Sequence, residues 1–301
     1  MGGPSAEHDV SLKTAAMVIR HLDKNKYTHI PVKIERNGTW PMTISELKNQ
    51  ADIAFIAMHG AYGEDGGIQT ILATHGIKYT GSDPIASAIA MDKEKSMQIL
   101  KNHKLKVPDY YIVHKKDSLL NFKNAKKIKL PVIIKPNTGG SSMGVSIIRD
   151  WKELAGALNE AFKFSDSAII QKYILGREVT CGVLHINGTA IPLMPTEIIP
   201  AKEQFFGYES KYSSGGSREL TPPDLPKAMI KKIQLTALNA HRALGCSGMS
   251  RTDMIIDKDD SVNVLELNTI PGMTETSLLP QGAKALGIHF PELLEHIINS
   301  A

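Results

Sequence analysis

The sequence predicts an α/β protein, and two observations lead to that prediction. Residues 11–24 carry apolar side chains at three- and four-residue spacing, which is typical of a helix, and residues 51–58 form an unbroken apolar run. An unbroken run of this length is typical of a buried parallel strand, and its alternation with helices is typical of an α/β unit. Short strand patterns and helix patterns continue to alternate further along the chain.

The composition excludes several classes of protein. With 301 residues, 42% of them hydrophobic, the chain is long enough for two or three domains and too apolar for disorder. The formal net charge of +4 is weak for a protein that grips nucleic acid, and no apolar run approaches the ~18–20 residues of a membrane span. The two cysteines are too few for a disulfide framework, and the N-terminus lacks a signal-peptide pattern. We therefore expect a cytoplasmic globular protein with neither nucleic acid nor membrane as a partner. Globular proteins of this size are most often enzymes, so we also expect an enzyme.

The first part of the chain, to about residue 81, opens on Gly-Gly-Pro-Ser with no strand pattern before it. The predicted strand at 51–58 ends at His59-Gly60, and a second helix is expected around 68–75. Residues 59–66 combine a histidine, two carboxylates and three glycines. Open α/β sheets bind ligands at this end of their strands, so the segment is a candidate site; a structural histidine is the alternative.

The next part, over residues 82–175, begins with a predicted helix near 85–101. A stretch over 101–129 follows and holds nine lysines against two aspartates. We interpret it as the solvated face of a small domain, because neither interleaved aromatics nor a nucleic-acid-binding motif accompanies it. The remaining predicted strands of this part are at 132–135, 145–148 and 168–172. A capping box at 150–153 is predicted to start a helix that runs to about residue 164.

The last part, over residues 176–301, begins with a hairpin whose Asn187-Gly188 turn joins strands at 179–186 and 189–194. A polar loop is expected over 201–220. A long amphipathic helix follows over 229–244, and Gly245 stops it.

A second hairpin, over residues 251–268, gives the sharpest chemical prediction. If its polar turn is centred between residues 259 and 260, Asp253 lies opposite Glu266 and Arg251 lies opposite Asn268. The same register predicts that Ile255 and Val264 continue this face, and that the other face is filled by Met254, Ile256, Leu265 and Leu267.

This register has an electrostatic consequence. Two opposed carboxylates on a buried sheet repel each other unless a cation lies between them. Carboxylate and amide oxygens are ligands that Mg²⁺ prefers, so Asp253, Glu266 and Asn268 are predicted metal ligands. The alternatives are a carboxyl pair that shares a proton or a salt bridge to Arg251.

Two further segments are suited to a nucleotide. The loop from Lys135 to Gly144 is rich in glycine and serine, so its N–H groups can cradle phosphate. The loop joins two strands and lacks the Gly-Lys-Ser/Thr ending, so it is neither a Walker P-loop nor a Rossmann fingerprint. The alternative to a phosphate-binding loop is a flexible hairpin. The strand end at 171–174 offers backbone N–H and C=O groups to a purine edge, and Glu178 can accept hydrogen bonds from both ribose hydroxyls. The alternative interpretation of this segment is an inter-domain linker.

Taken together and in this order, these segments resemble the D-alanine–D-alanine ligases of the ATP-grasp superfamily over essentially the whole chain. The matching motifs are Gly2–Leu12, His59-Gly60-x-x-Gly63-Glu64-Asp65-Gly66, Met91-Asp92-Lys93, the Gly-Ser-Ser-x-Gly loop ending at Gly144, Tyr208–Tyr212, Arg251-x-Asp253 and Glu266–Thr274. The resemblance implies a three-domain ATP-grasp architecture that is α/β overall and α+β in the ATP-grasp part. The implied domains are an N-terminal Rossmann-like preATP-grasp domain (1–81), a small central domain (82–175) and a catalytic domain (176–301), in a chain that forms a homodimer.

The resemblance also implies the reaction. ATP phosphorylates the carboxylate of one D-alanine, and the amine of a second D-alanine attacks the acyl phosphate, giving D-alanyl-D-alanine, ADP and phosphate for peptidoglycan synthesis. Two Mg²⁺ or Mn²⁺ ions assist, and ATP is the co-substrate. The alternatives are a relative that uses D-lactate or another D-amino acid as second substrate, and a non-catalytic nucleotide- or nucleic-acid-binding protein.

By the same resemblance, individual residues receive roles. ATP is assigned to Lys93, Lys135, Ser142 and Gly144 (phosphates), Gln171, Lys172 and Ile174 (adenine) and Glu178 (ribose). The metal ions are assigned to Asp253, Glu266 and Asn268. The reacting groups are assigned to Arg251 and the Gly272 N–H (oxyanion hole), Glu7 and His59 (first D-alanine), Ser141 and Tyr212 (hydrogen bonds to Glu7), Lys211 (phosphate) and Ser277 and Leu278 (carboxylate of the second D-alanine).

Three departures from the family pattern stand out. Gln171 replaces the usual glutamate, but its amide oxygen can still accept from an adenine amino group. Most relatives place a glutamate or an arginine where this chain has Gly139 or Asn137. Relatives also carry a short strand before Gly2-Gly3, so we expect either a misplaced start site or a weakened site for the first D-alanine.

Overall fold

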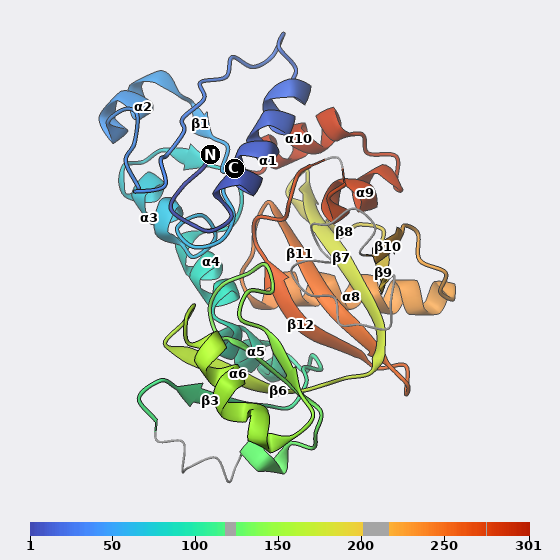
Figure 1. Ribbon diagram of the computed structural model, residues 1–301. Helices are drawn as coiled ribbons and strands as arrows, with labels where there is room; N and C mark the ends of the chain where they lie inside the picture. The colour runs from blue at the N-terminus through green and yellow to red at the C-terminus, as the bar shows by residue number, and fades with distance from the viewer. Residues whose placement is uncertain (118–124, 201–216, 275) are drawn as a thin grey trace.

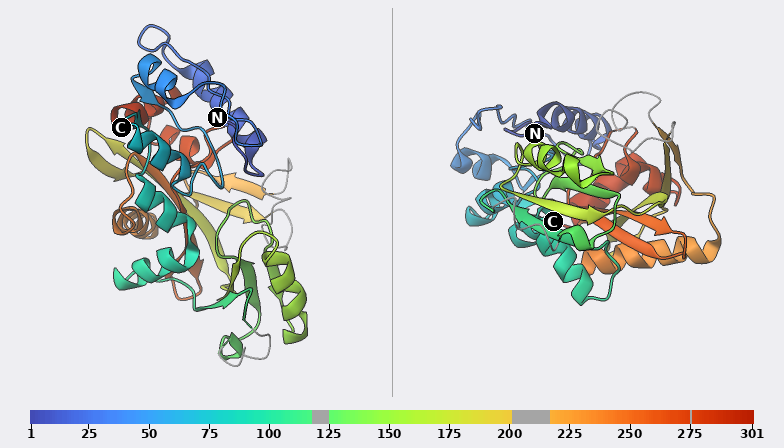
Figure 2. Two further views of the ribbon diagram at one scale, coloured as in Figure 1. Left: turned by 90° about the vertical axis from the view of Figure 1, so that its left-hand side faces the viewer. Right: turned by 60° about the horizontal axis from the view of Figure 1, so that its bottom comes forward.

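The computed structural model describes residues 1–117, 125–200, 217–274 and 276–301, and it has the predicted mixture of helices and sheets (Figure 1). Three sheets organise it: a parallel pair β1-β2, a four-stranded sheet in the order β3-β6-β4-β5, and a six-stranded sheet in the order β10-β9-β7-β11-β12 with β8 on β7. The four-stranded sheet and the N-terminal part lie at opposite ends of the molecule, and the six-stranded sheet lies beside both (Figures 1 and 2).

The N-terminal part contains less strand than predicted. Its elements are α1 (His8–His21), α2 (Ile44–Gln50), β1 (Ile53–Ala54), α3 (Gly67–Thr74) and β2 (Lys78–Tyr79). Of the predicted strand 51–58, only β1 pairs with a neighbour, and Ile56 continues as buried backbone whose N–H donates to Thr80 Oγ1. Residues 1–3 run beside 32–34: the Gly3 N–H donates to Ile34 O, and the Ile34 N–H donates to Met1 O.

The middle part is built on the four-stranded antiparallel sheet. Its elements are α4 (Pro84–Met91), α5 (Lys93–Asn102), β3 (Tyr110–His114), η2 (Ala125–Lys127), β4 (Val132–Pro136), β5 (Ser146–Ile148), η3 (Trp151–Glu153), α6 (Leu154–Ala161) and β6 (Ser167–Lys172). The capping box at Asp150 is present and starts η3 and α6, as predicted. The single helix predicted over 85–101 is wrong, because Asp92 has extended backbone dihedrals and its side chain accepts from the Lys95 N–H to start a second helix, α5.

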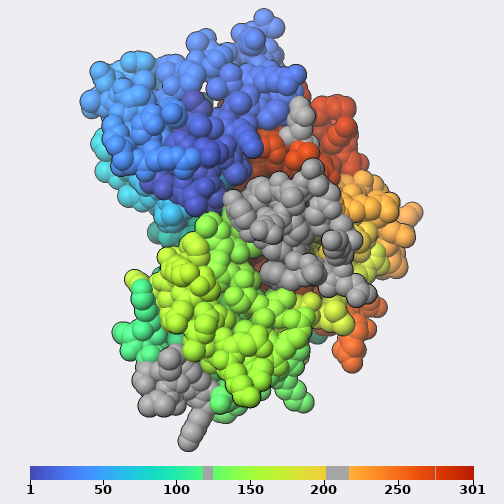
Figure 3. All heavy atoms as spheres, viewed as in Figure 1, coloured from blue at the N-terminus to red at the C-terminus, as the bar shows by residue number. Residues whose placement is uncertain are grey.

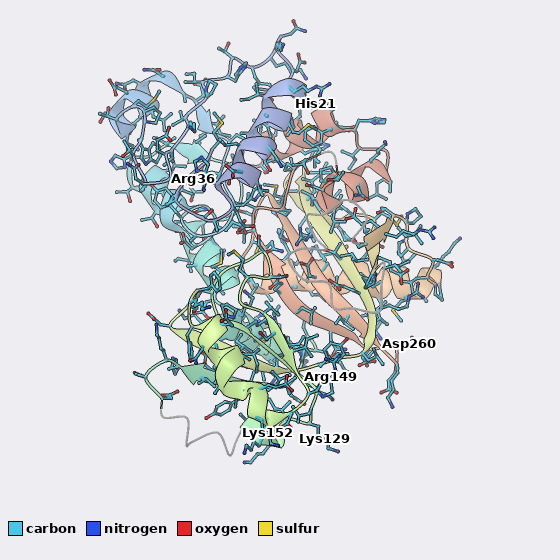
Figure 4. The ribbon with its side chains drawn as sticks, viewed as in Figure 1. His21, Arg36, Lys129, Arg149, Lys152 and Asp260 are labelled. Carbon is cyan, nitrogen blue, oxygen red and sulfur yellow. The ribbon has the colours of Figure 1, made fainter. Side chains whose placement is uncertain are left out.

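The lysines of the 101–129 stretch agree with the interpretation as a solvated face. Every lysine of that stretch that the structure describes is exposed. Lys129 lies with Lys152 at the outer end of the four-stranded part, away from the N-terminal part (Figure 4).

The last part is the six-stranded sheet and its helices. Its elements are β7 (Gly176–Ile186), β8 (Thr189–Pro192), β9 (Thr196–Pro200), β10 (Ser217–Leu220), α8 (Lys227–Ala243), β11 (Met249–Asp257), β12 (Val262–Asn268), α9 (Leu278–Lys284) and α10 (Phe290–Asn299). The β7–β8 hairpin turns at Asn187-Gly188, both with positive φ, as predicted. The end of the expected loop 201–220 is instead strand β10, which pairs with β9; residues 201–216 lie outside the described residues.

The β11–β12 hairpin has the predicted register at the site and a different one toward its turn. Arg251 pairs with Asn268 and Asp253 with Glu266, as expected. A bulge follows Asp253, so Val264 pairs with Met254, and the predicted pairing of Ile255 with Val264 is wrong. The extra residue in β12 also changes the expected faces, because Leu265 lines a cavity together with Ile255.

Three clusters of buried apolar side chains hold these parts. One lies inside the four-stranded part, one joins α5 and α8 to a face of the six-stranded sheet, and one joins the N-terminal part to α9, α10 and the opposite face of β7. All three parts are exposed on the face of the molecule that Figure 3 shows. In the described residues, no helix is long and apolar enough to cross a membrane.

Candidate active site

Two adjoining cavities of about 440 and about 830 Å³ lie where the three parts meet. Both are lined by Glu7, Lys93, Ser141, Glu178, Asp253 and Glu266, which come from all three parts. The smaller cavity adds His59, Arg251, Asn268, Gly272, Ser277 and Leu278, and the larger adds Lys135, Ser142, Gln171 and Ile174. The fold therefore gathers sixteen of the predicted site residues around one connected space.

The β11–β12 hairpin supplies the charged floor of the smaller cavity. Arg251 Nε donates to Asp253 Oδ1 at 2.9 Å, and its Nη2 donates to Oδ2 at 2.8 Å. Thr180 of the neighbouring strand β7 donates to Asp253 Oδ1 at 2.6 Å, and Asn268 Nδ2 lies 3.5 Å from Oδ2. Asp253 is therefore held by a bidentate ion pair, which is the salt-bridge alternative of the sequence interpretation.

Charge in this floor is balanced. Burial lowers the pKa of Arg251, but the neighbouring Asp253, and then Glu266 and Glu64, outweigh it and raise that pKa above its ordinary value. Arg251 is thus a permanent cation. Lys93 provides the second cation, with its Nζ 3.7 Å from Glu266 Oε2.

The Asp, Glu and Asn donors fit a hard divalent cation by their chemistry and placement. Asp253, Glu266 and Asn268 stand at paired positions on adjacent strands and line the smaller cavity, and each offers a side-chain oxygen. The three residues could therefore hold a magnesium or manganese ion that shares the Asp253 charge with Arg251.

The glycine- and serine-rich loop between β4 and β5 lines the smaller cavity together with the β11–β12 hairpin. Ser141 (φ 55°) and Ser142 (φ 56°) both occupy the left-handed region, which L-residues rarely adopt. Two contacts hold the loop: Lys93 Nζ donates to Gly139 O at 2.6 Å, and Ser141 Oγ donates to Glu7 Oε1. The predicted link between Ser141 and Glu7 is present, and it connects the middle part to the N-terminal part.

The larger cavity contains most of the residues predicted for the nucleotide. Lys135 is the next-to-last residue of β4, Glu178 lies near the start of β7, and Gln171 lies in β6 with its Nε2 donating to Met97 Sδ at 3.4 Å. Two predicted residues do not line either cavity. The Lys172 side chain is exposed and its N–H donates to Asp109 O, so the group that Lys172 offers to a nucleotide is its backbone carbonyl. Gly144 has a positive φ of 69°, and a Cβ at this position would contact the ring of Phe164.

The far end of the smaller cavity is the segment before α9. Ser277 is the N-cap of α9, so the predicted helix start is present, and its Oγ accepts from the Thr274 N–H at 2.9 Å. A Cβ on Gly272 would lie 2.8 Å from Ser277 Oγ, so a larger residue here would displace the Ser277 hydroxyl from its contact with the Thr274 N–H.

Two predicted residues, Lys211 and Tyr212, lie outside the described residues. The sequence interpretation missed Thr180 and Lys13, which the structure places at Asp253 and at the smaller cavity, and Thr14, whose Oγ1 lies 2.8 Å from His59 Nε2. A signal for Thr14 exists in the sequence, because Glu7, Ser11 and Thr14 follow helical spacing.

The arrangement suits chemistry on an activated acyl group. Lysines, loop N–H groups and a predicted cation site are suited to phosphates, and Arg251 and Gly272, which line one cavity, offer a permanent cation and a backbone N–H to a developing oxyanion. A carboxylate at Glu7 can receive a substrate ammonium.

Known proteins match this chain over its full length. The family described as D-ala D-ala ligase C-terminus matches residues 99–299, and D-ala D-ala ligase N-terminus matches residues 1–50 and 41–82. The chain is 37% identical to the D-alanine–D-alanine ligase of Clostridium botulinum and 40% identical to that of Citrifermentans bemidjiense, over 100% of this chain and 96% and 94% of those proteins.

Solved structures agree with these matches. The VanG D-Ala:D-Ser ligase from Enterococcus faecalis matches with a TM-score of 0.89 and 30% identity, over 99% of this chain and 97% of that chain. The D-alanine–D-alanine ligase from Bacillus anthracis complexed with ATP matches with a TM-score of 0.85 and 37% identity, over 100% of this chain and 94% of that chain.

Proposed function

Since this chain belongs to the D-alanine–D-alanine ligase family, we propose that it joins two D-alanine molecules with ATP hydrolysed to ADP and phosphate. The family and ATP-grasp fold expected from the sequence motifs are confirmed. The observation in the structure that supports the activity most directly is the shared cavity, where Glu7, held by Ser141, lies with Arg251 and Asp253. We also propose domain boundaries near residues 82 and 175.

In the first step, the carboxylate of one D-alanine attacks the γ-phosphorus of ATP, and ADP leaves. We assign the ammonium of this D-alanine to Glu7, and we place its carboxylate near His59. Lys93 and Lys135 neutralise phosphate charge, and the Ser141–Gly144 loop covers the phosphates. Adenine is assigned to Gln171 and Ile174 with the carbonyl of Lys172, and ribose to Glu178.

In the second step, the amine of another D-alanine attacks the carbonyl carbon of the acyl phosphate. The amine loses a proton, negative charge develops on the carbonyl oxygen, and phosphate leaves as the C–O bond breaks. Arg251 and the N–H of Gly272 stabilise that oxygen; loss of one such donor typically costs about 10²–10³ in rate. The second D-alanine's carboxylate is assigned to Ser277 and Leu278, and Lys211 and Tyr212 are assigned to the phosphate and to Glu7.

We also assign a divalent cation to the carboxylate and amide side chains of the β11–β12 hairpin. Asp253, Glu266 and Asn268 would hold magnesium or manganese, which when bound would neutralise charge on the phosphates. The supporting observation is the opposition of the two carboxylates on adjacent buried strands.

A second candidate uses D-serine or D-lactate in place of the second D-alanine. The TM-score of 0.89 with a D-Ala:D-Ser ligase gives D-serine the more specific support.

The experiment is an assay of ADP release that depends on D-alanine, with products identified by mass spectrometry. D-Alanine alone should give D-alanyl-D-alanine, and the dipeptide should remain the main product when D-serine or D-lactate is added in equal amount. Asp253→Ala should abolish turnover, whereas Asp259→Ala, in the exposed turn of the same hairpin, should not. A dominant mixed product would support the second candidate, and absence of D-alanine-dependent ADP release would refute both.

A further inference from the structure

Three hydroxyl groups from α1 and the turn before it hold His59. Ser5 Oγ donates to His59 O at 2.6 Å, the His59 N–H donates to Ser11 Oγ at 2.9 Å, and Thr14 Oγ1 lies 2.8 Å from His59 Nε2. Ser11 and Thr14 are fully buried. Because they lie four and seven residues after Glu7, they share its face of the chain at the start of α1. The backbone and the ring of His59 are therefore both fixed by the segment that carries Glu7.

The second ring nitrogen of His59 contacts a distant part of the chain. His59 Nδ1 lies 3.1 Å from Ile270 O, and 3.4 Å from Glu64 Oε1. A carbonyl oxygen can only accept, so this hydrogen bond requires the proton on Nδ1. In the neutral ring, Nε2 is then the acceptor, and Thr14 is its donor. The contacts on the two sides of the ring thus select one tautomer.

The carbonyl of Ile270 lies close in sequence to the proposed oxyanion donor. Only Pro271, whose ring fixes φ, separates Ile270 from Gly272. On its other side Gly272 is confined by Ser277, because a Cβ there would lie 2.8 Å from Ser277 Oγ. Between the peptide plane of the Ile270 carbonyl and that of the Gly272 N–H, only ψ of Pro271 is free to turn, so the direction of this N–H is coupled to where the Ile270 carbonyl is held.

We propose that Thr14 is a positioning residue for the ligation: it fixes the tautomer and orientation of His59, and His59 holds the Ile270 carbonyl and so aims the Gly272 N–H. This inference rests on the proposed function, in which that N–H stabilises the oxyanion. It gives His59 a role besides lining the site of the first D-alanine, because both ring nitrogens are engaged by the protein itself.

The test compares Thr14→Val, which keeps the shape and removes the hydroxyl, with Thr14→Ser, which keeps the hydroxyl. Thr14→Val should lower kcat about tenfold, less than the about 10²–10³ for loss of a whole donor, and change KM for ATP less than twofold. Thr14→Ser should return kcat to within about threefold of wild type. Thr252→Val is the matched control, because Thr252 Oγ1 is also buried but has no hydrogen-bond partner among the described residues; its kcat should be unchanged.

A second readout follows the ring itself. The ¹⁵N signals of His59, assigned by their loss in His59→Gln, should show a protonated Nδ1 and an unprotonated Nε2 in wild type and Thr14→Ser. In Thr14→Val the buried Nε2 loses its donor, so these signals should move toward a mixture of tautomers. The comparison is made at a temperature where each variant is folded by circular dichroism.

Several results would overturn the inference. A wild-type ring protonated at Nε2 refutes it even if Thr14→Val does not fold. Equal loss of kcat in Thr14→Val and Thr14→Ser, or normal kcat in Thr14→Val, also refutes it. The readouts separate it from the proposed function: a wild-type chain without D-alanine-dependent turnover but with the expected tautomer refutes the function alone.

Discussion

A buried histidine pair between α8 and the six-stranded sheet should make stability depend on pH. His241 is 1% exposed; its Nε2 lies 3.0 Å from Nε2 of His185 on β7, and its Nδ1 lies 2.7 Å from Ser250 Oγ on β11. Burial first, and then the nearby positive charges of His185 and Arg242, together lower the pKa of His241 to about 4. The folded protein therefore keeps this ring neutral at pH values where an exposed histidine is charged.

The sign and size of the effect follow from linkage. The unfolded chain has the ordinary histidine pKa of about 6.5, so between pH 6.5 and 4 it binds more protons than the folded chain, and stability falls as pH falls. The contribution is fully present above pH 6.5. At about 1.4 kcal/mol per pKa unit, about 2 kcal/mol of it is lost by pH 5 and about 3 kcal/mol by pH 4. His185, whose pKa burial also lowers, acts in the same direction.

The assay is urea unfolding followed by circular dichroism at pH 7.5 and pH 5. Carboxylates also titrate in this range, so the informative quantity is the difference between wild type and His241→Gln, which cannot be protonated. The variant should be less stable than wild type at pH 7.5, but its free energy of unfolding should fall by about 2 kcal/mol less between the two pH values. His75→Gln, at the exposed C-cap of α3, should keep the wild-type dependence. If His241→Gln keeps it as well, the reasoning fails.

Three further predictions concern the site and its surroundings. Arg251→Lys loses the bidentate contact with Asp253, so the rate of ADP release should fall about 10²–10³-fold with the fold intact by circular dichroism; a loss below tenfold would contradict this. Thr252→Val removes a buried hydroxyl that has no partner among the described residues, so urea unfolding should show a gain of about 1 kcal/mol, and a loss would be the opposite of what we expect. Gly60→Ala should destabilise by about 1–3 kcal/mol and raise KM for D-alanine, because φ is 75° and the new Cβ would lie 2.6 Å from Glu7 Oε2; unchanged denaturation and kinetics would argue against it.

The β11–β12 hairpin shows how much of the strand pairing can be predicted from the local sequence pattern. The polar turn and the alternation of side chains were enough to predict the pairs Asp253–Glu266 and Arg251–Asn268. The bulge after Asp253 could not be predicted, because an extra residue in β12 depends on how Leu265 packs against the rest of the protein. The error leaves the charged pairs in place because the bulge lies between them and the turn.

The break between α4 and α5 shows where local pattern fails. The apolar spacing continues through Asp92, so the sequence predicts one helix. In the structure, Asn137 from the distant phosphate-loop segment donates to Asp92 Oδ1 at 3.0 Å and accepts from the Glu94 N–H at 2.8 Å. A side chain forty-five residues away thus stabilises the break, whereas the local signal within 85–101 is Asp92, a residue type favoured at N-caps, inside a continuous apolar pattern.

That break also has a chemical consequence, which links the fold to the need for a cation. Because of the break, α5 starts at Lys93, whose Nζ lies 3.7 Å from Glu266 Oε2. Arg251 forms the corresponding ion pair with Asp253. The two cations and two carboxylates balance each other before any ligand binds. A nucleoside triphosphate brings several negative charges into a space whose further lining cations include Lys135, Arg149 and Arg177, the last of which pairs with Glu197. The floor itself is already neutral, so the divalent cation proposed at Asp253, Glu266 and Asn268 would add the positive charge that phosphates placed against it need.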